Sequence, residues 1–274
     1  MIKQLEQVFK QELDAQLPSR VVEAMGYSLL SSGKRVRPQL IYKMLEDYGV
    51  HHENTPYVAG ALECIHTYSL IHDDLPALDN DDMRRFMPTN HKVFGEDIAI
   101  LAGDGLLTMA FSLLAKAGVD ARFVEILARN AGTQGMILGQ EIDILDDIHS
   151  IEDLKECYTL KTGGLFSAAF EFATLLADDK DKQKDAQNLG ALMGIAFQLQ
   201  DDLLEVKSDA KTIGKSTESD LDRDIKTITS FLSLEDAENL LDEYFSRMDP
   251  ILDSFNFKTT HLKDYIDSLR NRSL

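Results

Sequence analysis

The chain has 274 residues, 44% of them hydrophobic, which suffices for a full apolar core and excludes a disordered chain. Its net charge of −19 excludes the basic surface on which nucleic-acid binding depends. The two cysteines, Cys64 and Cys157, lie far apart without metal-ligand spacing, and no apolar stretch indicates a signal peptide or a membrane span. We therefore expect a soluble, cytoplasmic protein with reduced thiols.

The predicted elements are helices throughout the chain. In order, the helices expected from apolar periodicity span residues 57–74, 93–114, 121–147, 151–177, 186–206 and 235–272. No region combines alternating β-branched residues with Asn-Gly or Asp-Gly turns, so we do not expect a sheet. Because no long linker or repeat divides the chain, the sequence predicts one all-α domain, residues 1–274, of about ten helices.

A cluster of aspartates follows the first of these apolar helices. Pro76 disfavours helical conformation at Leu75, so Asp73 and Asp74 are expected in the last helical turn. The helix dipole leaves partial negative charge at that end, and further aspartates follow within the next eight residues. Each like-charge pair at about 4 Å costs on the order of 4 kcal/mol near a protein surface, so the cluster requires cationic partners.

A second acidic cluster lies on the helix predicted for residues 186–206. A polar stripe with the spacing i, i+3, i+4, i+7 consists of Gln198, Asp201, Asp202 and Glu205. The preceding turns of this helix are apolar, so three carboxylates there are costly to hold without partners.

Either cluster taken singly is compatible with a solvated acidic surface. Two clusters on two core helices, both offering only oxygen atoms, instead indicate a hard cation such as Mg²⁺ and not zinc. Mg²⁺ usually takes one or two carboxylates and completes its coordination with water and phosphate oxygens. The predicted ligand is therefore a phosphate or diphosphate that joins both helices.

Basic residues are scarce in this chain, and a diphosphate ligand requires some of them. They gather at Lys34, Arg35 and Arg37, at Arg84 and Arg85, at Lys161 and at Lys215. Residues 34–37 are also compatible with a solvated turn. The string Gly214-Lys215-Ser216 looks like the end of a nucleotide-binding loop, but no strand precedes it, so we reject that interpretation. His66 lies two helical turns before Asp73, and both a core histidine and a ligand-binding one remain open.

These motifs, in this order, resemble those of bacterial short-chain trans-prenyltransferases, and of farnesyl diphosphate synthases in particular. The resemblance extends from Gly33 to about Thr229 and includes GKRVRP, ECIHTYSLIHDDLPALDNDDMRR, GQEIDIL, LKTGGLF, FQLQDDLLE and IGKST. It implies a bundle of ten or more helices around a central cavity, usually homodimeric. It also implies a Mg²⁺-dependent head-to-tail (1′-4) condensation of isopentenyl diphosphate with dimethylallyl or geranyl diphosphate.

The resemblance assigns roles to individual positions. Three Mg²⁺ ions would be held by Asp73, Asp74, Asp79, Asp201, Asp202 and Glu205, with Asp73, Asp79 and Asp201 as direct ligands. The allylic diphosphate would be contacted by Arg84, Lys161 and Lys215. The diphosphate of isopentenyl diphosphate would be bound by Gly33, Lys34, Arg37, His66 and Arg85. Thr162 and Gln198 would lie beside the allylic carbon chain and shield the allylic cation.

In such a reaction the released diphosphate removes the proton, so no protein base is required. A bulky aromatic residue at the floor of the cavity limits the product in the similar family. Tyr68, five residues before Asp73 and so about 7.5 Å along the helix axis, would be that residue, with Ser69 beside it. The resemblance therefore implies a farnesyl product.

Some positions depart from the pattern of the family. Glu205 replaces a third aspartate, while Phe86 and Leu138 stand where glycines are usual. A geranyl or geranylgeranyl diphosphate synthase is the alternative within the same chemistry. A non-catalytic regulatory subunit would be expected to lack one acidic motif or the basic residues, and a class I terpene cyclase would not need Lys34, Arg37 and His66.

Overall fold

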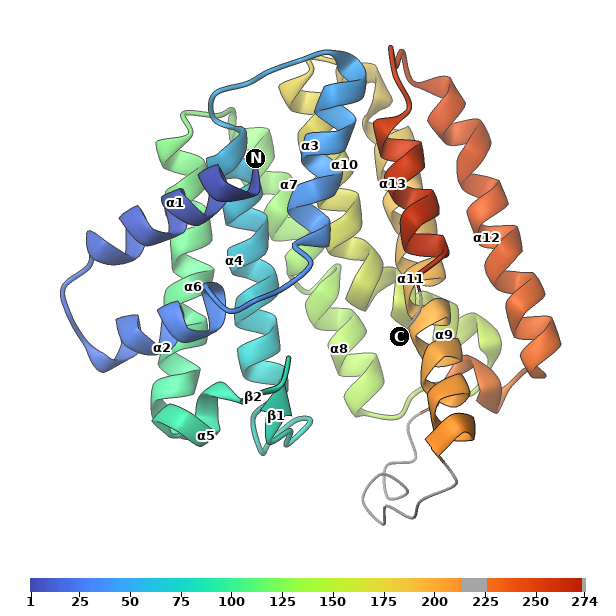
Figure 1. The fold of residues 1–274 in the computed structure, drawn as a ribbon, viewed down its shortest axis with the longest axis horizontal. Coiled ribbons are helices and arrows are strands. Elements are labelled where there is room, and N and C mark those ends of the chain that lie inside the picture. Colours follow the sequence, from blue (N-terminus) through green and yellow to red (C-terminus); the bar gives the residue numbers. More distant parts are fainter. Residues whose placement is uncertain (213–225, 273–274) are drawn as a thin grey trace.

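The computed structural model describes residues 1–212 and 226–272, and Figure 1 shows how their helices are arranged. The first half consists of α1 (Ile2–Asp14), α2 (Arg20–Leu29), α3 (Val36–Tyr48), α4 (Thr55–Asp73), β1 (Met83–Arg84), β2 (Met87–Pro88), α5 (Asn90–Phe94) and α6 (Glu96–Lys116). The second half consists of α7 (Ala121–Ala131), α8 (Met136–Ile144), α9 (Ile151–Tyr158), a π-helical turn (Thr159–Gly163), α10 (Gly164–Leu176), α11 (Gln183–Thr212), α12 (Leu234–Ser254) and α13 (His261–Arg270), with short 3₁₀ turns at Lys180–Lys182 and Ile228–Ser230.

The all-α prediction is confirmed, but three predicted helices are each two helices. The region 93–114 is divided at Gly95, whose φ of +94° suits glycine and interrupts the helix between α5 and α6. The region 121–147 is divided between α7 and α8, and the region 235–272 between α12 and α13. A 3.6-residue period continues across such breaks, because both halves bury an apolar face.

The expectation that there would be no sheet is wrong in one place. Strands β1 and β2 pair antiparallel, with Met83 opposite Pro88 and Arg84 opposite Met87. The two turn residues, Arg85 and Phe86, have φ of +53° and +63°. Two consecutive positive φ values are the geometry of a tight hairpin turn that normally selects Asn-Gly, so the sequence does not reveal it.

The core is built around α4, α6 and α10. Helices α4 and α6 pack along each other, and every residue of α10 is buried between α3, α7 and α11. Helix α6 is the one helix in the described part of the chain that is long and apolar enough to cross a membrane by length and composition. Its residues Ala102, Leu106 and Ala110 are fully buried against the rest of the protein, as in the core helix of a globular domain.

Local breaks in helices bring polar side chains to one end of the bundle. Helix α4 ends at Asp73, as Pro76 predicts. The π-helical turn Thr159–Gly163 interrupts the passage from α9 to α10 and presents Lys161 and Thr162. Such π turns widen a helix by one residue and occur often at functional sites.

Asp47 anchors the C-terminal helix to the rest of the bundle. This fully buried carboxylate of α3 accepts hydrogen bonds from Thr259 Oγ1 (2.5 Å) and from the backbone N–H groups of His261 and Leu262 (both 2.8 Å). It thus accepts hydrogen bonds from the free N–H groups at the N-terminus of α13, which lies more than 200 residues further along the chain.

Replacing Asp47 with alanine should therefore lower the free energy of unfolding by about 2–4 kcal/mol, because charge-assisted bonds and a helix cap are lost. Urea denaturation would measure the loss. Asp253→Ala, an exposed aspartate of α12, is the matched control and should unfold at nearly the parent concentration. An Asp47→Ala protein as stable as the parent would contradict this role.

The backbone of the hairpin turn between β1 and β2 is strained at Phe86, which can also be tested. Phe86 is fully exposed and has a positive φ, so its ring contributes no burial while its Cβ strains the backbone. Phe86→Gly should raise the free energy of unfolding by roughly 1 kcal/mol, visible as a higher Tm. Phe86→Ala keeps a Cβ at the same φ and should show no such gain; equal stabilisation by both variants would exclude backbone strain as the cause.

Candidate active site

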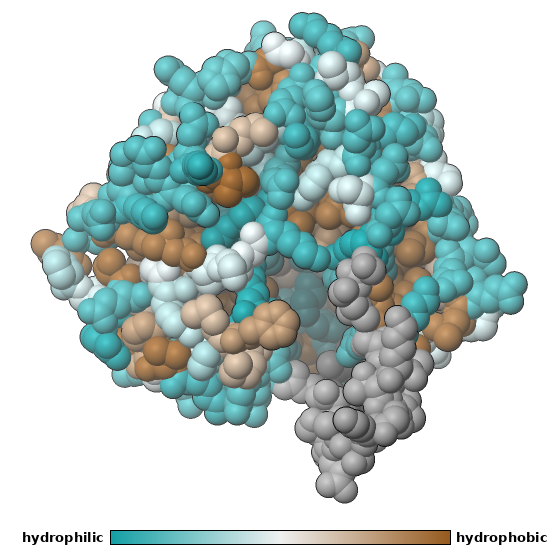
Figure 2. Space-filling model, in the orientation of Figure 1, coloured by the Kyte–Doolittle hydropathy of each residue, from teal (hydrophilic) through white to brown (hydrophobic). Residues whose placement is uncertain are grey.

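A cavity of about 1080 Å³ opens between α3, α4, α8, the π-helical turn and α11. Figure 2 shows the molecule hollowed near the middle of one face, with hydrophilic residues inside the hollow. The predicted site residues that line the cavity are Gly33, Lys34, Arg37, His66, Tyr68, Ser69, Asp73, Arg84, Arg85, Lys161, Thr162, Gln198 and Asp201. Lys215 lies outside the described residues. The sequence motifs thus converge on one space although they come from five separate segments.

The first acidic motif forms one side of the cavity. Burial raises the pKa of Asp73 to about 7, and the neighbouring Asp79 adds to the rise while Lys161 opposes it. The backbone N–H of Asp79 donates to the carbonyl of Asp73 at 2.8 Å, which folds the loop back on the helix end. Asp74 points elsewhere: it is buried and accepts a 2.7 Å hydrogen bond from Arg84 Nε. The two adjacent aspartates therefore have different surroundings, and Asp73 is the one that faces the cavity.

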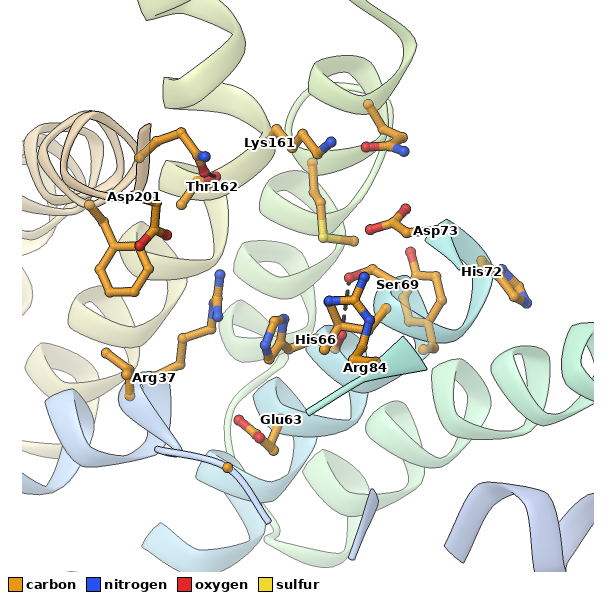
Figure 3. A pocket seen from close by; sticks show the side chains of 18 of the residues that line it. Arg37, Glu63, His66, Ser69, His72, Asp73, Arg84, Lys161, Thr162 and Asp201 are labelled. Carbon is orange, nitrogen blue, oxygen red and sulfur yellow. Dashed lines mark hydrogen bonds between the residues drawn. The ribbon is translucent and has the colours of Figure 1, made fainter. Parts of the chain in front are cut away.

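The second acidic motif contributes the opposite side, as Figure 3 shows for Asp201 and Asp73. The predicted single stripe is divided, because adjacent residues on a helix point about 100° apart. Asp201 lines the cavity, whereas Asp202 is buried behind it and Glu205 is exposed. Asp202 accepts hydrogen bonds from Tyr158 Oη (2.5 Å) and the Ile228 N–H (2.9 Å), and burial raises its pKa to about 6.

Asp201 has a partner that the sequence did not indicate. Arg272, just after α13, donates to the carboxylate of Asp201 and to the carbonyl of Phe197, and its guanidinium lies 3.9 Å from the centre of the Phe197 ring. Its Nε also donates to Gln200 Oε1 at 3.0 Å. The pKa of Asp201 is raised by burial and lowered again by Arg272 and Lys34. No sequence signal links Arg272 to residue 201, because only the packing of α13 on α3 and the hydrogen bond from Gln200 of α11 to the carbonyl of Arg270 bring them together.

The basic residues are held in defined positions around the cavity. Lys161 Nζ forms a 2.5 Å ion pair with Asp143 of α8. Arg37 lies with its guanidinium 4.8 Å from the centre of the Phe166 ring, its Nε has no partner, and burial lowers its pKa to about 10. The pKa of His66 is well below its usual range, because it is buried and four arginines surround it. His66 is therefore neutral and can act on an anion as a hydrogen-bond donor without being a cation.

Four residues that the sequence interpretation left unassigned belong to this site: Glu63, Gln140, Asp143 and Arg272. Gln140 lines the cavity, and both polar atoms of its amide are buried without a partner. Asp143 and Gln140 occur in the string GQEIDIL, whose polar residues three apart on an apolar helix were an available signal.

The acidic residues also bear on metal binding. Within residues 1–212 and 226–272, no three His, Cys, Asp or Glu side chains are close enough to form a metal centre by themselves. Asp73 and Asp201 instead face each other across a cavity that basic side chains also line. The side chain of Asp73 is largely buried and makes no ion pair with a described residue. This all-oxygen arrangement fits Mg²⁺ that is bound together with phosphate oxygens of a ligand.

Several known proteins are similar to this chain in sequence and fold. The polyprenyl synthetase profile matches residues 18–254. A farnesyl diphosphate synthase of Bacillus subtilis is 37% identical, with 97% of this chain and 92% of the relative covered. A geranyltranstransferase of Thermotoga maritima superposes with a TM-score of 0.84 at 32% identity, covering 98% and 97% of the two chains.

A geranyltransferase of Helicobacter pylori, complexed with magnesium and isoprenyl diphosphate, has a TM-score of 0.79 at 32% identity, with 97% of this chain and 94% of that chain covered. The profile match spans most of the chain. The relatives are similar to it in sequence, and the solved structures are similar to it in both sequence and helical fold. The chain belongs to the polyprenyl synthetase family.

Proposed function

We propose that this protein is a Mg²⁺-dependent prenyltransferase that makes farnesyl diphosphate from isopentenyl diphosphate and dimethylallyl or geranyl diphosphate. The observation that carries the proposal is the cavity itself, in which Asp73 and Asp201 face each other and several basic residues line the same space. Its relatives of the same family include farnesyl diphosphate synthases at 37–41% identity. Two anionic groups can thus be bound at once, as a condensation of two diphosphates requires.

The allylic diphosphate would lie between the two acidic motifs. Arg84 and Lys161 line this region, and we propose Lys215 as a third contact. Asp73, Asp79 and Asp201 would hold the metal, with three ions as the proposed number. When bound, Mg²⁺ would neutralise the charge that develops on the departing diphosphate. Asp74 and Asp202 are held by Arg84 and Tyr158, and Glu205 has the longest reach of the six acids.

Isopentenyl diphosphate would bind on the other side of the cavity. We propose that its diphosphate is bound by a set of cavity-lining residues, Gly33, Lys34, Arg37, His66 and Arg85. Three of these are permanently cationic at neutral pH, and neutral His66 adds a hydrogen-bond donor. Binding of both substrates in this way would bring the double bond of the second beside the first carbon of the allylic one, which would raise the effective concentration of the reacting groups.

The chain's own groups account for control of the carbocation. Thr162 Oγ1 donates to Gln198 Oε1 at 3.2 Å, so an oxygen atom from each side chain lies at the cavity wall. These dipoles stabilise positive charge on the allylic carbons, while Met136, Ile137 and Phe197 keep water away. The departing diphosphate takes the proton that is lost as the new double bond forms, so the protein supplies no base.

We further propose that the protein is cytoplasmic and acts as a homodimer. Large apolar side chains on the outer side of α5 and α6 remain 41–50% exposed, namely Val93, Ile100 and Leu101. An apolar strip of this kind on a long helix is suited to a second copy of the chain.

Incubation with isopentenyl diphosphate, geranyl diphosphate and Mg²⁺ tests the activity. We expect farnesyl diphosphate and diphosphate as products, identified by chromatography after dephosphorylation. Asp73→Ala and Asp201→Ala should each lower kcat by at least about a hundredfold, because charge stabilisation in the transition state is lost. Absence of condensation by the parent protein would overturn the proposal and favour a regulatory subunit.

Product length should depend on Tyr68. Its ring is 7% exposed, lines the cavity and contacts the His72 ring edge-on at 5.7 Å between centroids. Tyr68→Ala removes this floor and should shift the product beyond the fifteen-carbon chain, whereas Tyr68→Phe keeps the ring and should release the parent's product. If Tyr68→Ala still stops at the parent's product, another residue limits chain growth.

A further inference from the structure

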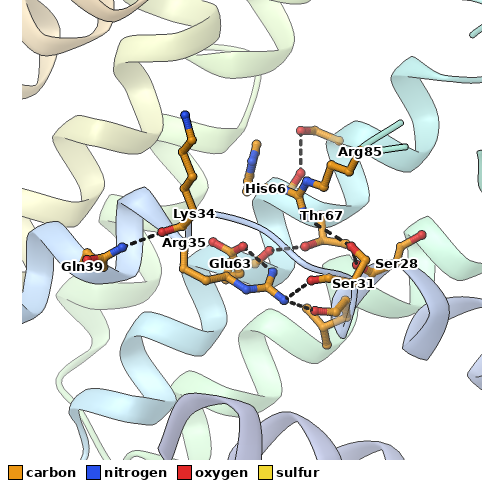
Figure 4. Close-up of polar contacts among 11 residues, drawn as sticks. Ser28, Ser31, Lys34, Arg35, Gln39, Glu63, His66, Thr67 and Arg85 are labelled. Carbon is orange, nitrogen blue, oxygen red and sulfur yellow. Dashed lines mark hydrogen bonds and ion pairs between the residues drawn. The ribbon is translucent and has the colours of Figure 1, made fainter. Parts of the chain in front are cut away.

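The region proposed for isopentenyl diphosphate lies on a buried ion pair that has no assigned role. We propose that Glu63 and Arg35 are positioning residues for this substrate: together they fix the loop that carries Gly33 and Lys34, and Glu63 counterbalances Arg37 and Arg85 before the substrate binds. The inference rests on the proposed function, because it concerns how one of its two substrate regions is built. Figure 4 shows the contacts involved.

Arg35 is the centre of the network. Its Nη1 donates to Glu63 Oε1 at 2.7 Å, and its Nη2 donates to the carbonyls of Leu29 (2.6 Å) and Ser31 (2.8 Å). Both charged side chains are almost inaccessible, at 4% and 2% exposure. Arg35 also has a left-handed backbone, with φ of +47°. The loop between α2 and α3 is therefore tied to α4 through the guanidinium of Arg35, which lines the cavity together with Lys34 and Arg37.

The same loop fixes Arg85. Arg85 Nη1 donates to Ser31 Oγ at 3.2 Å, and its guanidinium lies so close to Gly33 that a Cβ there would come within 2.7 Å of it. Ser31 is thus shared, since its carbonyl accepts from Arg35 and its hydroxyl from Arg85. A shift of this loop would move Lys34 and Arg85 together, because both are attached to it.

The negative charge of Glu63 also acts on the neighbouring arginines. Burial lowers the pKa of Arg37 to about 10 and also lowers the pKa of Arg85, and the negative charge of Glu63 opposes both changes. Four arginines act on His66 here, and the buried Glu63 acts on three of them: it pairs with Arg35 and its charge also acts on Arg37 and Arg85. Without it these cations would repel each other in a desolvated region and would be expected to move apart.

Glu63 lines the cavity, yet it is not suited to touch a diphosphate, because both are anions. A role confined to folding predicts loss of stability with unchanged substrate affinity. A positioning role predicts a loss confined to one substrate, because Lys161 and Arg84 on the allylic side have other partners, Asp143 and Asp74.

Steady-state kinetics of Glu63→Gln with each substrate varied in turn distinguish the two roles. We expect the KM for isopentenyl diphosphate to rise by at least about tenfold, since small misplacement of binding groups has large effects, while the KM for geranyl diphosphate stays at the parent value. The matched control is Glu171→Gln in α10, which removes the charge from a similarly buried glutamate that also pairs with an arginine, Arg129 (2.5 Å), away from the cavity lining. It should leave both KM values unchanged.

If Glu63→Gln fails to fold, the double variant Arg35→Met with Glu63→Met replaces the pair with apolar side chains, which often restores stability. We expect this variant to fold and still show the raised KM for isopentenyl diphosphate. Recovery of the parent KM would overturn the inference, as would Glu63→Gln with equal effects on both substrates or with none. An inactive parent protein would instead refute the proposed function.

Discussion

The protein has to hold many charged side chains of both signs around one partly apolar cavity. The electrostatic repulsion between like charges there, and the cost of removing them from water, explain much of the structure. Like charges 4 Å apart repel by about 4 kcal/mol even near a surface, and more where water is excluded. Two acidic motifs and several basic residues share this space. Each charge therefore needs a compensating group, either from the protein or from the ligands that the cavity binds.

The protein supplies that compensation through individual pairs spread over distant segments. Arg84 pairs with Asp74, Lys161 with Asp143, and Arg272 with Asp201. Asp73 is different, because its pKa is raised to about 7 and it pairs with no described cation. The nearby cations offset the charge of Asp73 only in part, which leaves the site less stable than it could be, and the binding of metal and diphosphate can recover that energy.

Adjacent residues that look equivalent in the sequence contact different groups in the structure. Asp73 and Asp74 are adjacent, as are Asp201 and Asp202, yet only the first of each pair lines the cavity. The second of each pair is buried and anchors other parts of the fold, through Arg84 in one case and through Tyr158 and Ile228 in the other. Arg35 lines the cavity together with Lys34 and Arg37, but its guanidinium is bound to Glu63 and is almost inaccessible. Helical rotation of about 100° per residue explains why Asp201 and Asp202, adjacent on α11, diverge in this way.

The sequence by itself determined the helical class and most of the site, because a 3.6-residue period and carboxylates within apolar helices are local properties. Asp73 and Asp201 could be found in this way, whereas the role of His66 followed only from the resemblance to a family. It did not determine the helix breaks, the hairpin at Arg85 and Phe86, or the roles of Glu63, Asp143 and Arg272. Those depend on contacts between segments far apart in the chain, such as Arg272 with Asp201 across 71 residues. Only the tertiary packing decides which of two adjacent acids meets the cavity and which meets a protein partner.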